Sequence, residues 1–229
     1  MKITFNISDP SGNGSPFEFT PLRAYNFGYA GRSADEVRAH VEELEELGFP
    51  APERTPTIYP IAPAKVSAES SVSVRGTESY GEVEFALVQT TAGLLVCVAS
   101  DHTDMAVETV STARAKTIYP DLLSAEAWRY EDVADHWDSL TLTGERLGEN
   151  GWETVQHGSV SSLMTPSQLL QELQSRSGEE NAAGTVLLSG TIGGEIRPGA
   201  QAWRNTLSDP VMDRRLVVEY TVREEPLEL

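Results

Sequence analysis

The sequence contains almost no cysteine and no long hydrophobic run. Its only cysteine among 229 residues, Cys97, excludes a disulfide framework and makes the reducing cytoplasm the expected compartment. No apolar stretch approaches the ~20 residues of a membrane-spanning helix. The N-terminal segment MKITFNISDP lacks the apolar centre of a signal peptide. We therefore expect a cytoplasmic chain that has no membrane partner.

Positive charge is also scarce. The chain has 35 acidic and 17 basic residues, which gives a net charge of −18. This charge repels a polyphosphate backbone, so we expect no nucleic-acid partner. Three of the basic residues are lysines, namely Lys2, Lys65 and Lys116. An acidic chain nearly without lysine is typical of halophilic proteins, because the Debye length falls to ~3 Å at ~1 M salt. An acidic protein from an ordinary habitat is the alternative.

The residue pattern predicts a β-dominated α+β fold in a single domain, residues 1–229. Runs of alternating or continuous apolar residues predict strands at 2–7, 71–75, 82–89, 94–99, 184–191, 202–207 and 214–222. Helical patterns lie at 33–47, 104–116 and 166–175, with one or two short helices within 122–140. Five prolines between Pro50 and Pro63 predict a loop there.

The helix predicted at 33–47 carries a polar pair. Ser33 and Glu36 form an S-x-x-E capping box at its start. His40 and Glu43 are three residues apart, so they are neighbours on one face of the helix. Such a pair can act as a base and the acid that orients it. A structural His–Glu pair fits the same spacing.

The segment Glu82-Val83-Glu84 places two carboxylates on one face of a predicted strand, ~6.6 Å apart along it. Carboxylates this close favour a cation or a proton between them. If residues 90–93 form a tight hairpin loop, Glu82 lies opposite Asp101 on the next strand. Three converging carboxylates supply the oxygen ligands that Mg²⁺ or Mn²⁺ prefers. A solvated acidic face is the alternative.

Other polar residues follow the predicted strands. His102 comes directly after Asp101 and can orient it, or it is a turn residue. Lys116 stands out in a chain that otherwise uses arginine, which suggests that a compact ammonium is needed there. Gly190 and Thr191 end a buried strand in a turn whose backbone can approach a ligand closely.

Taken in order, these motifs resemble the fumarylacetoacetate hydrolase-like superfamily, especially its small acylpyruvase and oxaloacetate decarboxylase members. Gly31-Arg32 followed by His40-Val41-Glu42-Glu43 resembles the GRNY…HVxE lid helix, here at residues 31–48. Glu82-Val83-Glu84 resembles the E-x-E metal pair, and Asp101-His102-Thr103 resembles the stretch with the third metal ligand. Ala115-Lys116 matches the AKS/GKS lysine, and Ser189-Gly190-Thr191 matches the GT-x-x-G threonine.

The resemblance implies a mixed β-roll or pseudo-barrel with a few flanking helices. It implies an Mg²⁺- or Mn²⁺-dependent enzyme that hydrolyses a carbon–carbon bond of a small 2-oxo acid, or decarboxylates it, through a metal-stabilised enolate. The implied metal ligands are Glu82, Glu84 and Asp101, and the implied catalytic residues are His40, Glu43 and Lys116. The implied substrate-binding residues are Arg32, His102, Gly190 and Thr191.

Two departures from the family pattern remove positive charge expected near the substrate. Met105 stands where the family has an arginine, and Tyr59-Pro60 replaces a lysine-proline pair. The candidate replacements are Arg32, Arg114 and Arg197.

Two other functions stay open. One is a hydratase or isomerase of the same superfamily, and the other is a catalytically silent metal- or ligand-binding protein. The resemblance favours a homodimer, for which the terminal hairpin with Trp203 and Tyr220 is the candidate contact.

Overall fold

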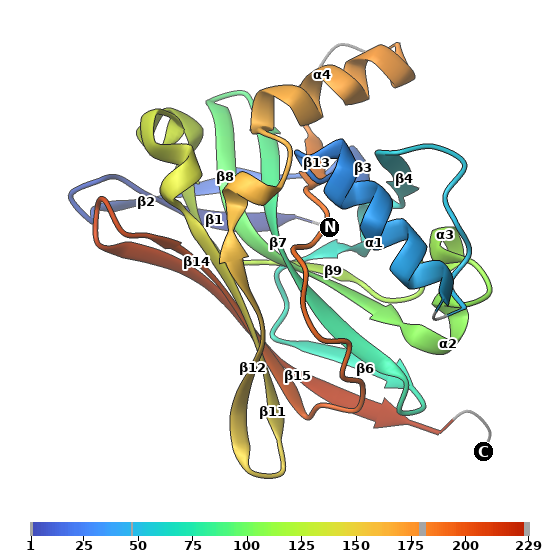
Figure 1. Ribbon diagram of the computed structural model, residues 1–229. Coiled ribbons are helices and arrows are strands. Elements are labelled where there is room, and N and C mark those ends of the chain that lie inside the picture. The colour runs from blue at the N-terminus through green and yellow to red at the C-terminus, as the bar shows by residue number, and fades with distance from the viewer. Residues whose placement is uncertain (1, 47, 179–181, 227–229) are drawn as a thin grey trace.

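The computed structural model describes residues 2–46, 48–178 and 182–226. Their strands form one ten-stranded and one five-stranded sheet (Figure 1). The predicted helix end at Leu47 lies outside the described residues. No described helix combines the length and the apolar composition needed to cross a membrane.

The larger sheet runs in the order β2-β1-β10-β8-β7-β13-β3-β4, and β9 joins it by pairing with β8 and β5. Its strands are β1 (Ile3–Ser8), β2 (Gly14–Phe19), β3 (Arg23–Gly28), β4 (Thr57–Ile61), β5 (Val66–Ser67), β7 (Ser79–Thr90), β8 (Gly93–Asp104), β9 (Asp121–Leu123), β10 (Glu126–Arg129) and β13 (Thr185–Leu188).

The smaller sheet runs in the order β12-β11-β14-β15-β6. Its strands are β6 (Ser71–Arg75), β11 (Thr141–Gly148), β12 (Gly151–Ser159), β14 (Ala202–Asp209) and β15 (Arg214–Glu225). The α-helices are α1 (Ala34–Glu46), α2 (Met105–Glu108), α3 (Thr112–Ala115) and α4 (Pro166–Ser177). The 3₁₀ helices are η1 (Pro63–Lys65), η2 (Tyr130–Asp132), η3 (Ala134–Ser139) and η4 (Val160–Ser162).

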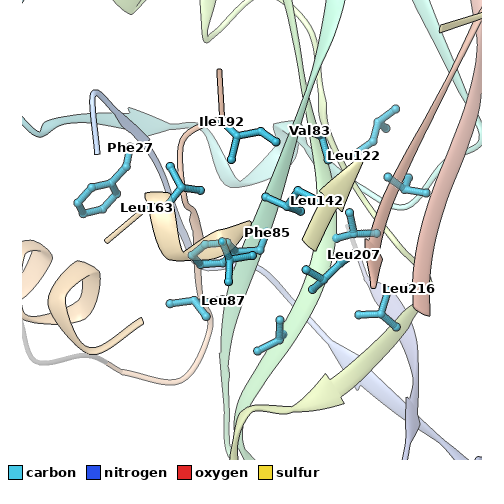
Figure 2. Close-up of a cluster of buried hydrophobic side chains, with 14 of the residues drawn as sticks. Phe27, Val83, Phe85, Leu87, Leu122, Leu142, Leu163, Ile192, Leu207 and Leu216 are labelled. Carbon is cyan, nitrogen blue, oxygen red and sulfur yellow. The ribbon is translucent and has the colours of Figure 1, made fainter. Parts of the chain in front are cut away.

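Two hydrophobic cores organise the strands. The first core lies between the sheets, where Val83 and Phe85 of β7 pack near Leu142 and Leu207 of the smaller sheet (Figure 2). The second core lies on the other face of β7 and β8 and draws residues from both ends of the larger sheet, including β2 and β4. The larger sheet therefore curls into a roll. This β-dominated α+β architecture is the fumarylacetoacetate hydrolase-like fold, so the predicted fold class is confirmed.

Most predicted strands and the helix at 166–175 are confirmed, but three segments differ. The proline-rich segment contains β4, because this strand lies at the edge of the sheet, where Pro60 needs no ladder hydrogen bond from its nitrogen. The helix predicted at 104–116 is split into α2 and α3, although Asp104 caps it as its sequence suggests. The segment 122–140 contains β10 as well as short 3₁₀ helices.

Trp203 and Tyr220 of the terminal hairpin are not exposed for a dimer contact. Both residues are 1% exposed and belong to the first core, because their strands turn these faces toward β7 and β8. The homodimer itself, with this hairpin as its contact, stays a prediction.

Candidate active site

The long hairpin of β7 and β8 brings the predicted carboxylates together. Thr90 pairs with Gly93 around a two-residue turn, and in this register Glu82 lies directly opposite Asp101. One ligand oxygen from each of Glu82, Glu84 and Asp101 lies within 4.8 Å of the others. The predicted hairpin register is therefore confirmed, and these three residues form a group that can hold a metal ion.

The position of this group follows from the alternation along β7. Val83 and Phe85 point into the first core, and Ala86 and Val88 of the opposite face point into the second core. Glu84 lies on the same face as Ala86, two residues earlier in the strand, and it is not part of the second core. The strand thus leaves its apolar surroundings at the two glutamates, both of which line a cavity.

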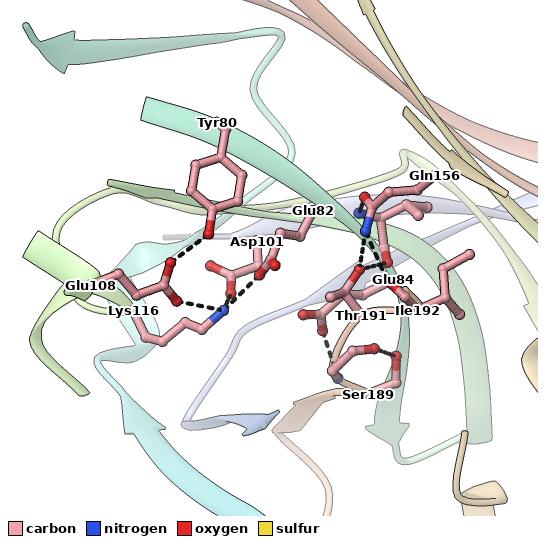
Figure 3. Close-up of polar contacts among 12 residues, drawn as sticks. Tyr80, Glu82, Glu84, Asp101, Glu108, Lys116, Gln156, Ser189, Thr191 and Ile192 are labelled. Carbon is pink, nitrogen blue, oxygen red and sulfur yellow. Dashed lines mark hydrogen bonds and ion pairs between the residues drawn. The ribbon is translucent and has the colours of Figure 1, made fainter. Parts of the chain in front are cut away.

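Lys116 lies among the carboxylates (Figure 3). Its ammonium nitrogen is 2.8 Å from an oxygen of Glu82 and also donates to Asp101. Burial disfavours the charged form, but Asp101 and Glu82 outweigh it and hold the pKa of Lys116 well above its usual value. Lys116 is therefore a buried, permanently charged group at neutral pH.

Glu84 is fully buried and only half satisfied. Its Oε2 accepts a hydrogen bond of 2.9 Å from the backbone N–H of Gly190, whereas its Oε1 has no partner. Burial and then the neighbouring Asp101 raise the pKa of Glu84 well above its usual value. A buried carboxylate oxygen without a partner is costly, so this position favours a bound cation or proton.

Asp121 is a further buried carboxylate, which no sequence pattern indicated. It begins β9 and pairs with Asp101, so Glu82, Asp101 and Asp121 form a row across three neighbouring strands. Burial and then Asp101 raise the pKa of Asp121 well above its usual value, and the charge of Lys116 opposes the shift. Because residues just after Asp121 were expected to be helical, no sequence signal placed it beside Asp101.

Glu108 was missed as well. Its Oε2 accepts a hydrogen bond of 2.5 Å from the Tyr80 hydroxyl, and its Oε1 is 3.9 Å from the ammonium of Lys116 (Figure 3). Burial raises the pKa of Glu108 to about 7, opposed by Lys116. The break between α2 and α3 positions Glu108, and an expected continuous helix concealed it.

The loop after β13 carries Gly190 and Thr191 to the site. Thr191 donates its hydroxyl proton to the carbonyl of Val83 at 2.9 Å and accepts from the Gln156 amide at 2.7 Å. The same Gln156 side chain accepts from the N–H of Val83 at 2.9 Å. Gln156, which no sequence pattern indicated, therefore joins this loop to the backbone between the two glutamates.

His40 and Glu43 lie on α1 at the mouth of the site. Two adjoining cavities, of about 280 and 570 Å³, share Glu82, Glu108 and Thr191, and His40 lines both. His40 Nδ1 and Glu43 Oε2 are 3.9 Å apart, which is too long for a hydrogen bond. The pair is therefore near the site but not tightly coupled in this conformation.

Three of the four predicted substrate-binding residues, namely Arg32, His102 and Gly190, do not line these cavities. Arg32 makes a double hydrogen bond to the Asp138 carboxylate, with both distances 2.8 Å, because its side chain turns toward η3. His102 lies on the face of β8 opposite to Asp101, where its Nδ1 is 2.9 Å from the Tyr220 hydroxyl. Burial lowers the pKa of His102 to about 3, so it is neutral. The roles predicted for Arg32 and His102 are not supported by this geometry.

The residues present fit a divalent cation. They offer three carboxylates whose oxygens converge, one of them with an orphaned buried oxygen. Hard oxygen donors without histidine or cysteine are typical of Mg²⁺ and Mn²⁺ sites. Lys116 contacts two of the same carboxylates, so its ammonium and a metal ion would share their charge.

Solved structures establish the fold but not the reaction. A structure of Cg1458 with inhibitor is 17% identical with a TM-score of 0.66, covering 98% of this chain and 90% of that chain. The apo form of 2-keto-3-deoxy-D-arabinonate dehydratase is 16% identical with a TM-score of 0.63, covering 90% of this chain and 74% of that chain. Among curated proteins, none matches this sequence significantly.

A family model gives the more direct assignment. The model described as "Protein of unknown function (DUF2848)" matches residues 27–220. This span includes the β7–β8 hairpin, α1 and the loop after β13, and hence every predicted site residue. The chain therefore belongs to the DUF2848 family.

Proposed function

We propose that this chain is a divalent-metal-dependent enzyme that cleaves a carbon–carbon bond of a small 2-oxo acid, by hydrolysis or decarboxylation. The observation that carries the proposal is the convergence of Glu82, Glu84 and Asp101 beside Lys116, at a cavity that the two glutamates and the lysine line. The structural likeness to a dehydratase of a 2-keto-3-deoxy acid supports a small keto acid as substrate.

Glu82, Glu84 and Asp101 would hold the metal. When bound there, Mg²⁺ or Mn²⁺ supplies Lewis-acid chemistry toward substrate oxygens, which is typically worth several kcal/mol. The N–H of Gly190 keeps Glu84 oriented through its 2.9 Å hydrogen bond. Gln156 and Thr191 form hydrogen bonds to the backbone of Val83. They therefore hold the loop after β13 against the segment of β7 that carries Glu82 and Glu84.

Lys116 is the residue best placed to stabilise negative charge on the substrate. It is buried and charged, and a preorganised charge in a site of low dielectric is effective because it needs no reorganisation. Thr191 already donates its hydroxyl proton to Val83, so we assign it to the loop structure rather than to a substrate carboxylate.

His40 would accept a proton from water, oriented by Glu43. Closure of α1 over the site would shield His40, whose side chain is 52% exposed, from bulk water. None of the residues described in α1 is buried, so little packing opposes such a movement. We propose residues 31–48 as a lid on this basis.

A dehydratase or hydratase reaction is the second candidate. It is favoured by the likeness to 2-keto-3-deoxyarabinonate dehydratase, which is seen in two of its structures. The same carboxylates and Lys116 would serve, since elimination next to a keto group also develops negative charge on the keto oxygen.

The test is a panel of acylpyruvates, oxaloacetate, 2-oxo-4-pentenoate and 3-deoxy-2-oxo sugar acids. Each is assayed with Mg²⁺, with Mn²⁺ and with a chelator, in low and high salt. Chelator-sensitive cleavage supports the first candidate, and chelator-sensitive loss or addition of water supports the second. Metal binding without turnover of any compound would instead indicate a silent ligand-binding protein.

A further inference from the structure

Building on the proposed function, we propose that the 2-oxo acid substrate carries a cationic group at its far end, and that Glu108 pairs with this group. The inference concerns the substrate class and rests on the charges that line the cavities. It makes Glu108 a specificity-determining residue.

Glu108 faces the cavities from a fixed position. Its side chain is 8% exposed, lines both cavities and is held by the Tyr80 hydroxyl at 2.5 Å. The nearest described cation, the ammonium of Lys116, is 3.9 Å from Oε1, beyond hydrogen-bonding distance. One oxygen of Glu108 is therefore available to a ligand, whereas two of the three N–H donors of Lys116 are used by Asp101 and Glu82.

Acidic groups dominate the lining of the two cavities. The described carboxylates on it are Glu36, Glu43, Glu82, Glu84, Glu108 and Glu195. Its described basic side chains are His40, Lys116 and Arg197. Even with a divalent ion bound, the carboxylates exceed the cations, so a second anionic group on the substrate would meet net repulsion.

The three candidate arginines do not change this balance, because Arg114 lines neither cavity and the other two are paired with carboxylates. Arg197 forms ion pairs with Glu195 and, at 3.4 Å, with Glu153. Arg32 is bound to Asp138 and does not line either cavity. Met105 packs against the first core at the position where the resemblance led us to expect an arginine. No described lining residue thus offers an unpaired guanidinium to a distal carboxylate.

The neighbours of Glu108 suit a cation. Tyr29 lines both cavities and Tyr59 lines the smaller one. The faces of aromatic rings attract ammonium groups. Burial raises the pKa of Tyr29 to about 12, so its hydroxyl is neutral. An ammonium among these rings would donate a charge-assisted hydrogen bond to the carboxylate of Glu108.

Three stable oxamates test the inference. N-(2-aminoethyl)oxamate, N-(2-hydroxyethyl)oxamate and N-(carboxymethyl)oxamate share one metal-chelating end and differ in the charge of the other. Their dissociation constants are measured calorimetrically with Mn²⁺ and with chelator. We expect the wild-type protein to bind the amine about tenfold more tightly than the alcohol, and the acid most weakly.

Two variants assign the effect to Glu108. Glu108→Gln should remove the preference for the amine over the alcohol, and Glu108→Lys should reverse the order in favour of the acid. Glu36→Gln is the matched control, because Glu36 lines the same cavity but is exposed and screened, so it should keep the wild-type order. Thermal unfolding of each variant verifies that it is folded.

The outcomes separate the two proposals. Metal-dependent binding that is tightest for the alcohol or the acid would overturn the cationic-substrate inference and leave the proposed function standing. The same holds for an unchanged order in both Glu108 variants. If none of the probes binds in a metal-dependent way, the proposed function fails, and this inference fails with it.

Discussion

At the scale of single residues, Glu84 determines whether the site can hold a metal. It is fully buried, and one of its oxygens has no partner. We predict that Glu84→Gln weakens Mn²⁺ binding by more than about 100-fold, because loss of a ligand should exceed the 10–100-fold cost of losing a supporting group. Calorimetric titration measures this loss, with the exposed Glu69→Gln as control. Unchanged affinity in Glu84→Gln would exclude the site.

Gly190 is required by the backbone. Its φ is +79°, and a Cβ there would lie 2.6 Å from the carbonyl oxygen of Phe27. We predict that Gly190→Ala lowers the free energy of unfolding by about 2 kcal/mol or more, measured by urea denaturation. Gly193→Ala is the matched control, since no atom lies within 4 Å of its Cβ position. Equal stability of the two variants would contradict the predicted strain.

The titration of Glu108 should be visible in the stability of the metal-free protein. Burial raises its pKa from an ordinary value of 4.5 to about 7. The folded state then binds the proton of Glu108 more tightly than the unfolded state does. The stabilisation that this protonation gives the folded state is fully present below pH 4.5 and is lost as the pH rises through about 7.

We therefore predict that the free energy of unfolding falls more steeply over this range in the wild type than in Glu108→Gln. Urea denaturation at several pH values, with chelator present, measures both slopes. Glu84, Asp101 and Asp121 shift in the same direction in both proteins, so the difference between the slopes belongs to Glu108. Parallel curves would show that Glu108 titrates normally.

At the scale of elements, α1 should be needed for turnover but not for metal binding. We predict that His40→Ala retains wild-type affinity for Mn²⁺ and loses at least about 100-fold in turnover of the substrate that the panel identifies, the usual contribution of a general base. Arg38→Ala, on an exposed part of the same helix, is the control. Full activity of His40→Ala would remove His40 from the reaction.

The elements also show what the sequence could predict. Local patterns were sufficient for the β7–β8 register, because the tight turn assumed at residues 90–93 is present and fixes which residues of the two strands face each other. They failed for β4, because whether a strand containing Pro60 lies at an edge depends on the rest of the sheet. They also failed for Glu108 and Asp121, which reach the site through a helix break and a three-residue strand.

At the scale of the whole molecule, the charge of −18 predicts a dependence on salt. Raising KCl from ~0.1 to ~1 M shortens the Debye length from ~10 to ~3 Å and screens repulsion among the surface carboxylates. We predict that the Tm rises over this range and that urea denaturation shows the same gain. A Tm that stays constant or falls would indicate an acidic protein from an ordinary habitat.

The carboxylates of the metal group and Glu108 lie on different elements. The first are fixed in a hairpin buried on both faces, whereas Glu108 ends the four-residue helix that follows β8. Under the proposed function, libraries that vary α2 and the turn after it would redirect the chain to new substrates while the ion-holding hairpin is kept constant. The same division offers natural selection a way to diversify relatives without rebuilding their chemistry.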